Sequence, residues 1–141
     1  MMKLQVATRP KGLGKKLDEK LEAQFQTKLK RQADLAIRVT MGDNPRGKPA
    51  LDTGAYVRSW SFSKQGRPRR VDSKKLSKGS GSIGDAERAK SALYSDISKI
   101  KLKGTTAIYL QNGAPHAPYV EYKHKYFIME TLANRIRNGN Y

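Results

Sequence analysis

The triplet Asp52-Thr53-Gly54 has the residue types of the catalytic loops of aspartic proteases. In those enzymes, two such loops hold two carboxylates about 3 Å apart, where they share a proton. Here the residues at 47–50 are Gly-Lys-Pro-Ala rather than an apolar strand, and no later apolar run ending in glycine completes the site. We therefore interpret the triplet as a turn. Asp52 or Thr53 caps the backbone, and Gly54 adopts an angle that other residues avoid.

Two further groupings have the residue types of known sites but lack their spacing. His116, Glu121 and His124 are potential metal ligands, but no cysteine joins them and the neighbouring prolines predict an irregular segment. The stretch Lys-Gly-Leu-Gly-Lys-Lys at 11–16 lacks the Ser or Thr that follows the lysine of a phosphate-binding loop. We therefore expect no metal, no cofactor and no catalytic residue in this chain.

The charge of the chain points to an anionic partner. Its 141 residues include 29 Lys and Arg against 12 Asp and Glu, which gives a net charge of +17. Such an excess favours binding to a polyanion, most commonly nucleic acid, or to an acidic protein surface. Contact with DNA is expected through backbone phosphates, because Tyr94 is the only aromatic residue between 64 and 103 on which a base could stack.

Much of this charge lies in one stretch that is poor in apolar residues. Residues 64–103 contain 12 basic and 4 acidic side chains, an excess of eight. Glycine and serine alternate near position 80, so we expect a mobile basic insertion at 64–84, or a long hairpin arm, in a single domain spanning 1–141. The alternative is a loop that is merely solvated. The candidate contacts to DNA or to an acidic partner are Lys64, Arg67, Arg69, Arg70, Lys74, Lys75 and Lys78.

Apolar periodicity predicts the elements that position these residues. The spacing predicts an amphipathic helix over 13–39, which would pack on the domain's own sheet or on a neighbouring subunit. Residues 97–103 fit a strand as well as the end of a helix. The other expected elements are strands at 59–62 and 105–111, a helix at 85–98 with Asp85 as its N-cap, and a C-terminal helix at 127–137. Together they predict an α+β fold in which a long N-terminal helix and a C-terminal helix pack on an antiparallel β-sheet.

The chain lacks the signals of a secreted or membrane protein. It has no cysteine, no run of about 18 apolar residues, and no apolar stretch in its first ten residues that suits a signal peptide. We therefore expect a protein of a reducing cytoplasm that has no membrane partner.

Two separated blocks, taken together, resemble the neck and tail-completion family of tailed bacteriophages, whose members are also described as minor tail proteins. The first block, at 49–60, reads Pro-Ala-Leu-Asp-Thr-Gly-Ala-Tyr-Val-Arg-Ser-Trp. The second, at 107–122, reads Ala-Ile-Tyr-Leu-Gln-Asn-Gly-Ala-Pro-His-Ala-Pro-Tyr-Val-Glu-Tyr. The order of the blocks and the helices that flank them also match the family. His116, Lys123 and the segment 124–127 depart from its pattern.

This resemblance implies a structural virion protein without catalytic residues. Such a protein forms a homo-oligomeric ring of six or twelve copies at the head–tail connector, beside portal, adaptor or stopper proteins and the tail terminator or tail tube. It would assemble in the host cytoplasm and reside in the neck or upper tail of the virion. The resemblance places subunit or partner contacts at Asp52, Thr53, Gly54, Trp60, Asn112, Pro115, Tyr119, Glu121 and Tyr122.

Other interpretations of the same residues stay open. Trp60 suits a core position as well as an interface. The main alternative for the whole chain is a stand-alone basic module that binds nucleic acid, followed by an RNA-associated basic protein.

Overall fold

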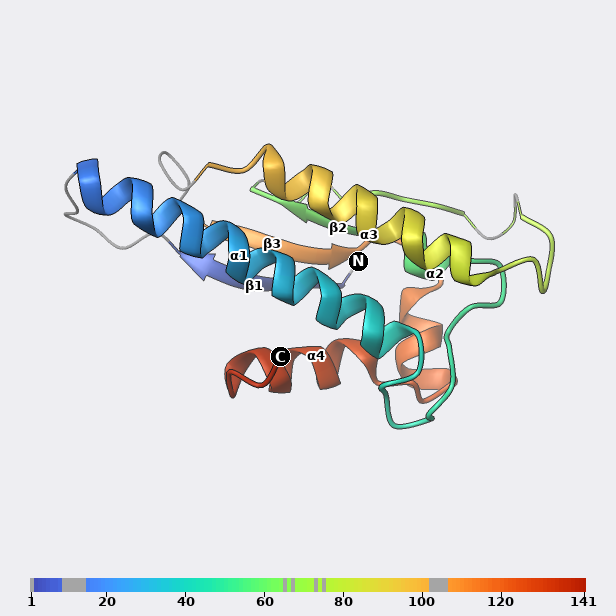
Figure 1. Ribbon diagram of the computed structural model, residues 1–141. Coiled ribbons are helices and arrows are strands. Elements are labelled where there is room, and N and C mark those ends of the chain that lie inside the picture. Colours follow the sequence, from blue (N-terminus) through green and yellow to red (C-terminus); the bar gives the residue numbers. More distant parts are fainter. Residues whose placement is uncertain are drawn as a thin grey trace.

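A three-stranded antiparallel sheet forms the centre of the described part of the chain (Figure 1). The computed structural model describes residues 2–8, 15–64, 66, 68–72, 74, 76–101 and 107–141, without the side chains of 2, 7, 8 and 15–18. The strand order is β1-β3-β2, so the last strand in sequence lies in the middle. The strands are β1 (Met2–Thr8), β2 (Trp60–Ser63) and β3 (Ala107–Asn112).

The register of the sheet aligns the end of β3 with the starts of both neighbouring strands. Asn112 at the end of β3 lies opposite Met2 of β1 on one side and opposite Trp60 of β2 on the other. β1 carries an irregularity between Gln5 and Ala7. The start of β2 and the end of β3 are therefore adjacent, which places the two sequence blocks side by side.

Three longer helices pack with the sheet. They are α1 (Lys15–Thr40), α3 (Ile83–Ser98) and α4 (Ile128–Arg137). In Figure 1, α1 crosses the sheet beside α3, and α4 lies along the other side of α1 next to β1. Two short elements complete the described structure: the helical turn α2 (Ala55–Arg58) and the π-helical turn η2 (Tyr119–Lys123).

The hydrophobic core lies between these helices and the sheet. Leu29, Leu35 and Val39 of α1 are completely buried, as are Ile108 and Leu110, which alternate along β3. In α1, Leu29, Ala33, Ala36 and Val39 are buried at spacings of three or four residues, and the buried apolar residues of β3 are two apart. These periods bring apolar side chains to one face of a helix and of a strand. These residues belong to one cluster of buried side chains that also includes parts of α3 and α4.

The structure confirms the α+β class and most of the expected elements. The long N-terminal helix, the strands near 59–62 and 105–111, and the C-terminal helix are all present, with ends that shift by one or two residues where the ends are described. On α3, the expected stripe of Ala86, Ala89, Leu93 and Ile97 is buried. Residues 13 and 14 of the expected first helix, and 102–106, lie outside the described residues.

Several expectations about local structure were wrong. The helix α3 begins at Ile83, with Ser82 as its N-cap, and Asp85 is the third helical residue, whose carboxylate reaches back to the Ser82 amide at 2.9 Å. This capping box satisfies the backbone amides of both Ser82 and Asp85, whereas an N-cap side chain alone would satisfy one. The strand alternative at 97–103 is wrong for its first residues, because α3 continues to Ser98. Strand β1 and the turn η2 were not predicted.

The segment after β2 does not form a hairpin in its described residues. Instead, Pro68 to Asp72 runs along the outer side of β2: the Arg69 amide donates to Ser61 Oγ at 3.2 Å, and the Val71 amide donates to Ser59 Oγ at 2.9 Å. Gly113 touches the same segment so closely that a Cβ at this position would lie 2.3 Å from the Arg69 carbonyl oxygen. The basic stretch is therefore held against the domain here rather than projecting from it.

Candidate functional site

The two sequence blocks interlock through backbone groups. The side-chain amide of Asn112 donates to the Tyr56 carbonyl at 2.8 Å, and its Oδ1 accepts from the Ala114 amide at 3.1 Å. The Gly113 amide donates to the Ser59 carbonyl at 3.0 Å. Because Asn112 is completely buried, these bonds lie in a water-poor environment where an unpaired amide is costly. Asn112 thus fixes the second block against the first.

The Asp-Thr-Gly triplet forms a structural turn, as the sequence predicted. Thr53 Oγ1 accepts from the Ala55 amide at 3.2 Å, and Gly54 has a φ of 80°. A side chain at Gly54 would also clash, since its Cβ would lie 2.5 Å from Asp85 Oδ2. Asp52 accepts the Gly79 amide through Oδ1 at 2.9 Å. The Asp52 carboxylate therefore anchors the far end of the basic segment.

Trp60 is a core residue. Its side chain is completely buried, and its Nε1 donates to Thr40 Oγ1 at 3.0 Å. Its ring meets the edge of Tyr56 with a centroid separation of 5.9 Å. Of the two interpretations left open by the sequence, the core position is confirmed for this chain.

Glu121 organises the start of the C-terminal helix. Its carboxylate is 1% exposed and accepts the Met129 amide through Oε2 and the Glu130 amide through Oε1, each at 3.0 Å. The N-cap residue Phe127, with a φ of 48°, supplies no side-chain cap. A carboxylate at this position satisfies amides that have no partner within the helix and interacts favourably with the helix dipole.

The structure therefore divides the motif residues into two groups. Gly54, Trp60, Asn112 and Glu121 are buried and support the fold, so a contact with another molecule through them would require the domain to open. The exposed members are Asp52, Pro115, Tyr119 and Tyr122, with Thr53 half-buried between the groups. Only this second group is placed to touch a partner directly.

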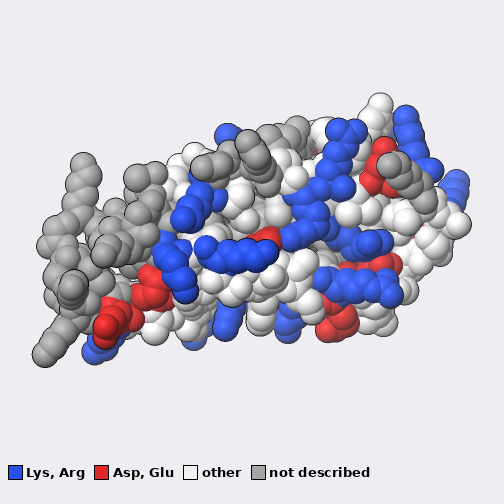
Figure 2. All heavy atoms as spheres, turned by 90° about the horizontal axis from the view of Figure 1, so that it is seen from above, with Lys and Arg blue, Asp and Glu red and all other residues white. Residues whose placement is uncertain are grey.

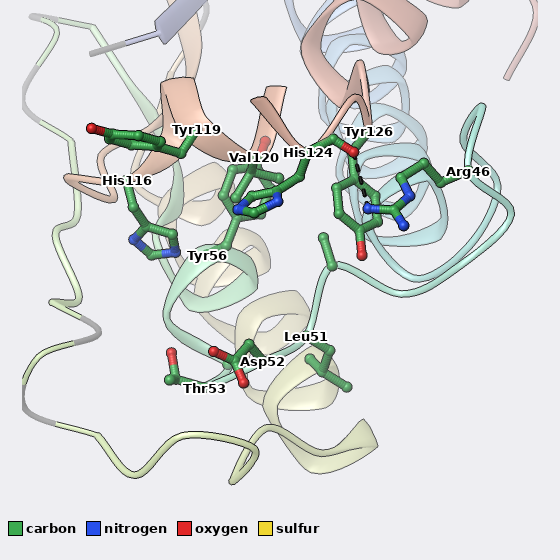
Figure 3. A pocket seen from close by; sticks show the side chains of 12 residues that line it. Arg46, Leu51, Asp52, Thr53, Tyr56, His116, Tyr119, Val120, His124 and Tyr126 are labelled. Carbon is green, nitrogen blue, oxygen red and sulfur yellow. Dashed lines mark hydrogen bonds between the residues drawn. The ribbon is translucent and has the colours of Figure 1, made fainter. Parts of the chain in front are cut away.

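A pocket of about 450 Å³ lies between the two blocks (Figure 3). The turn at 51–54 forms one wall, the segment from His116 to Tyr126 forms the other, and Tyr56 lies between them. His116 and His124 both line it, whereas Glu121 is directed into α4. Within the described residues, no group of three His, Cys, Asp or Glu side chains is arranged to hold a metal ion.

Two residues that line the pocket carry polar atoms that have no partner among the described residues. These are the Tyr56 hydroxyl, on a side chain 3% exposed, and His116 Nδ1. Burial raises the pKa of Tyr56 well above 10, with a smaller contribution from the Glu121 charge, so its hydroxyl stays protonated. Burial also lowers the pKa of His116 below 6.5. Sequence reasoning missed this pocket; its only signal was the polar and aromatic composition of both blocks.

The lowered pKa of His116 gives a pH-dependence of stability. The unfolded state takes up a proton near pH 6.5, whereas the folded state does so only at lower pH. The free energy of unfolding is therefore unaffected by His116 well above pH 6.5. It decreases as the pH falls through 6.5 and stops decreasing below the folded-state pKa of His116. We expect the variant His116→Asn to show a smaller fall in the free energy of unfolding over the same window. Urea titrations of both proteins at several pH values measure the difference; parallel curves would contradict it.

Part of the basic charge gathers on one face of the molecule. Figure 2 shows Lys and Arg side chains gathered over the face that contains α3 and the segment after β2. From the predicted set, Lys64, Arg70, Lys74 and Lys78 are exposed, and Arg67 and Lys75 lie outside the described residues. The helix α3 adds Arg88 and Lys90, and Lys99 follows as its C-cap. All three are exposed, and the predicted contact set did not include them.

Arg69 differs from the other predicted basic residues. Its guanidinium pairs with Asp96 at 2.8 Å and also donates to the Trp60 carbonyl. Burial raises the pKa of Asp96 despite the opposing effect of Arg69 and of the Phe62 amide. Arg69 therefore serves to hold the segment on β2 and α3, and it is less available than its neighbours for an external anion.

Comparisons with protein-family models, with curated proteins and with solved structures gave no match to this chain. Among the helices of the described residues, none combines the length and apolar character needed to cross a membrane.

Proposed function

We propose that this chain is a structural, non-catalytic virion protein of a tailed bacteriophage, and that it forms part of a ring at the head–tail connector. The observation that carries the proposal is the interlocking of the two blocks that resemble the neck and tail-completion family. The blocks are more than 40 residues apart in sequence. They nevertheless join through Asn112 and Gly113 into one unit that ends in exposed Tyr119 and Tyr122.

The geometry suits a joining role better than a chemical one. The one aspartate of the protease-like triplet accepts a backbone amide, and the buried glutamate of the second block caps a helix. These polar side chains are engaged in holding loops at fixed positions. A rigid end that carries exposed aromatic side chains is the kind of surface that anchors protein–protein contacts.

Particle assembly tests the proposal. In a phage that encodes this chain, deletion of its gene should leave DNA-filled heads and finished tails as separate objects in electron micrographs. Supplying the intact chain from the host should restore joined particles. Infectious, joined particles in the absence of the chain would overturn the proposal.

A stand-alone nucleic-acid-binding module is the second candidate, and the basic face in Figure 2 favours it. It predicts binding to duplex DNA that depends on salt and requires no phage partner. A ring subunit with the same face could also contact the genome without base-specific recognition. The two candidates differ in assembly, since only the ring subunit is needed to join heads to tails.

The basic face can be tested by neutralising its charges rather than by deleting the segment. Deletion would also remove the bonds to Ser59, Ser61 and Asp52, which hold the fold. We expect that changing Lys64, Arg70, Lys74 and Lys78 together to glutamine weakens duplex binding. Each lost phosphate contact should reduce the slope of log affinity against log salt by about 0.9.

The matched control for this variant carries the same loss of charge elsewhere. Lys20, Lys28, Arg31 and Lys48 are exposed and lie outside the segment. Their replacement by glutamine should leave a larger part of the salt slope intact, as measured by fluorescence anisotropy. If the two variants reduced duplex binding equally, only the net charge of the chain would matter, and the basic face would not be a specific contact surface for DNA.

A further inference from the structure

The end of the molecule that carries the pocket also carries exposed hydrophobic side chains. Ile83, Tyr119 and Tyr122 are 73%, 57% and 62% exposed, and they are the large hydrophobic side chains that are exposed in the described residues. Ile83 begins α3 next to the turn at 51–54, because the Gly81 amide donates to the Asp52 carbonyl at 2.9 Å. Tyr119 lines the pocket, and Tyr122 lies in the same turn η2. These three side chains therefore belong to the end of the molecule where α3 begins and where η2 lies; Figure 1 shows the backbone of this end.

The interior of the pocket is prepared for hydrogen bonding. Its walls include the apolar side chains of Ala50, Leu51 and Val120. The protonated Tyr56 hydroxyl and His116 Nδ1, on two other lining residues, are buried and have no hydrogen-bond partner in the part of the chain that the structure describes. A buried polar atom is normally paired, so these two atoms indicate a missing partner with its own polar groups. A peptide group, which has both a carbonyl and an amide, can satisfy a hydroxyl and an imidazole nitrogen.

Among the described residues, Arg46 is the Lys or Arg side chain that lines the pocket, and Lys123 lies beside the lining residue Tyr119. The Arg46 guanidinium lies 4.9 Å from the centre of the Tyr126 ring and uses one donor on the His124 carbonyl at 3.0 Å, as Figure 3 shows. Lys123 Nζ lies 5.4 Å from the centre of the Tyr119 ring. The rim of the pocket therefore has cations available for carboxylates, and the Asp52 carboxylate is the acidic group in the pocket lining.

We propose that this pocket binds an acidic peptide segment of a partner protein. One aromatic or branched apolar side chain of the segment enters the cavity, its main chain pairs with Tyr56 and His116, and its carboxylates pair with Arg46 and Lys123. The volume lies within the range of about 300 to 1,000 Å³ that is usual for binding pockets. The inference rests on the proposed function only in taking the partner to be a neighbouring protein of the head–tail connector.

A protein segment fits this site better than nucleic acid. The apolar walls suit an apolar side chain, and the Tyr56 hydroxyl and His116 Nδ1 suit a peptide group. The larger group of exposed cations lies on the separate face formed by α3 and the segment after β2. The chain thus has two chemically distinct surfaces, and the pocket is the less basic of them.

The test uses the intact, isotope-labelled chain and two capped hexapeptides, acetyl-Glu-Asp-Leu-Phe-Asp-Glu-amide and the same peptide with leucine in place of phenylalanine. Titration followed by NMR should give saturable shifts of backbone amides at 50–56 and 116–126. We expect Tyr56→Phe to weaken binding about three- to tenfold, and Arg46→Glu to weaken it about tenfold. The control Lys20→Glu, which has the same charge change on α1, should stay within about twofold.

Three results would overturn the inference. The first is the absence of saturable shifts at these residues with either peptide at about 1 mM, the weakest affinity expected of a specific site. The second is equal binding by the intact chain and Arg46→Glu. The third is tighter binding of an oligothymidylate than of the peptides to the same residues. If the chain binds the peptides but phage particles form without it, the pocket inference stands and the joining role is refuted. If particles require the chain but it does not bind the peptides, the joining role stands and the pocket inference is refuted.

Discussion

Trp60→Ala is expected to lower the free energy of unfolding by about 3 to 5 kcal/mol, the usual cost of removing a buried tryptophan. The side chain is completely buried, touches Tyr56 edge-on and donates to Thr40 Oγ1. Its loss opens a cavity beside α2 and removes the packing that holds this helical turn against the sheet. Urea unfolding monitored by circular dichroism measures the change.

Two further substitutions make the Trp60 result interpretable. Trp60→Phe retains most of the apolar surface but loses the hydrogen bond, so we expect a loss of about 1 to 2 kcal/mol. Tyr122→Ala removes an exposed aromatic side chain of the second block and should change stability by less than about 0.5 kcal/mol. If Trp60→Ala behaved like Tyr122→Ala, the core position of Trp60 would be wrong.

The second large effect is expected at Glu121. Replacing it with alanine removes both acceptors from the amides of Met129 and Glu130 at the start of α4. We expect a loss of about 2 to 4 kcal/mol, because buried backbone donors are left without partners next to a helix dipole. The local signature should be faster hydrogen exchange at these two amides than at the middle of α1.

The exposed neighbour Glu130 provides the control. Glu130→Ala removes the same charge from the first turn of α4 without removing a buried acceptor, so its effect should stay below about 1 kcal/mol. Glu121→Gln keeps one good acceptor and should fall between the two. An equal loss in Glu121→Ala and Glu130→Ala would mean that charge near the helix start, and not capping, stabilises α4.

The helical periodicity of apolar residues and the β-branched run of the sequence predicted the α+β class and most of its elements. The apolar stripes of α1 and α3 and the β-branched run of β3 lie where periodicity placed them. β1 was missed because its alternation consists of Met2, Leu4 and Val6 alone, which is a short signal. The start of α3 was misplaced because Ile83 and Gly84 are weak helix formers, so the pattern begins at Asp85.

The candidate site was predictable in composition but not in arrangement. The motif residues were identified, yet the roles of Trp60 and Glu121 as buried supports depend on long-range packing that no local pattern encodes. Tyr56, His116 and Arg46 meet in one pocket through long-range contacts, such as the bond from Asn112 to the Tyr56 carbonyl and the bond from Arg46 to the His124 carbonyl. Periodicity reports which face of an element is apolar, and it does not report which distant loop an individual hydroxyl will face.

Because the segment after β2 is attached to the domain, its cations lose less conformational entropy when they bind an anion. The segment is tied to Ser59, Ser61 and Asp96 near its start and to Asp52 near its end. Where the chain is already ordered, an anionic partner does not have to fix the backbone as it would for a free basic tail. Such preorganised charges lose less conformational freedom on binding, so each contact retains more of its electrostatic free energy.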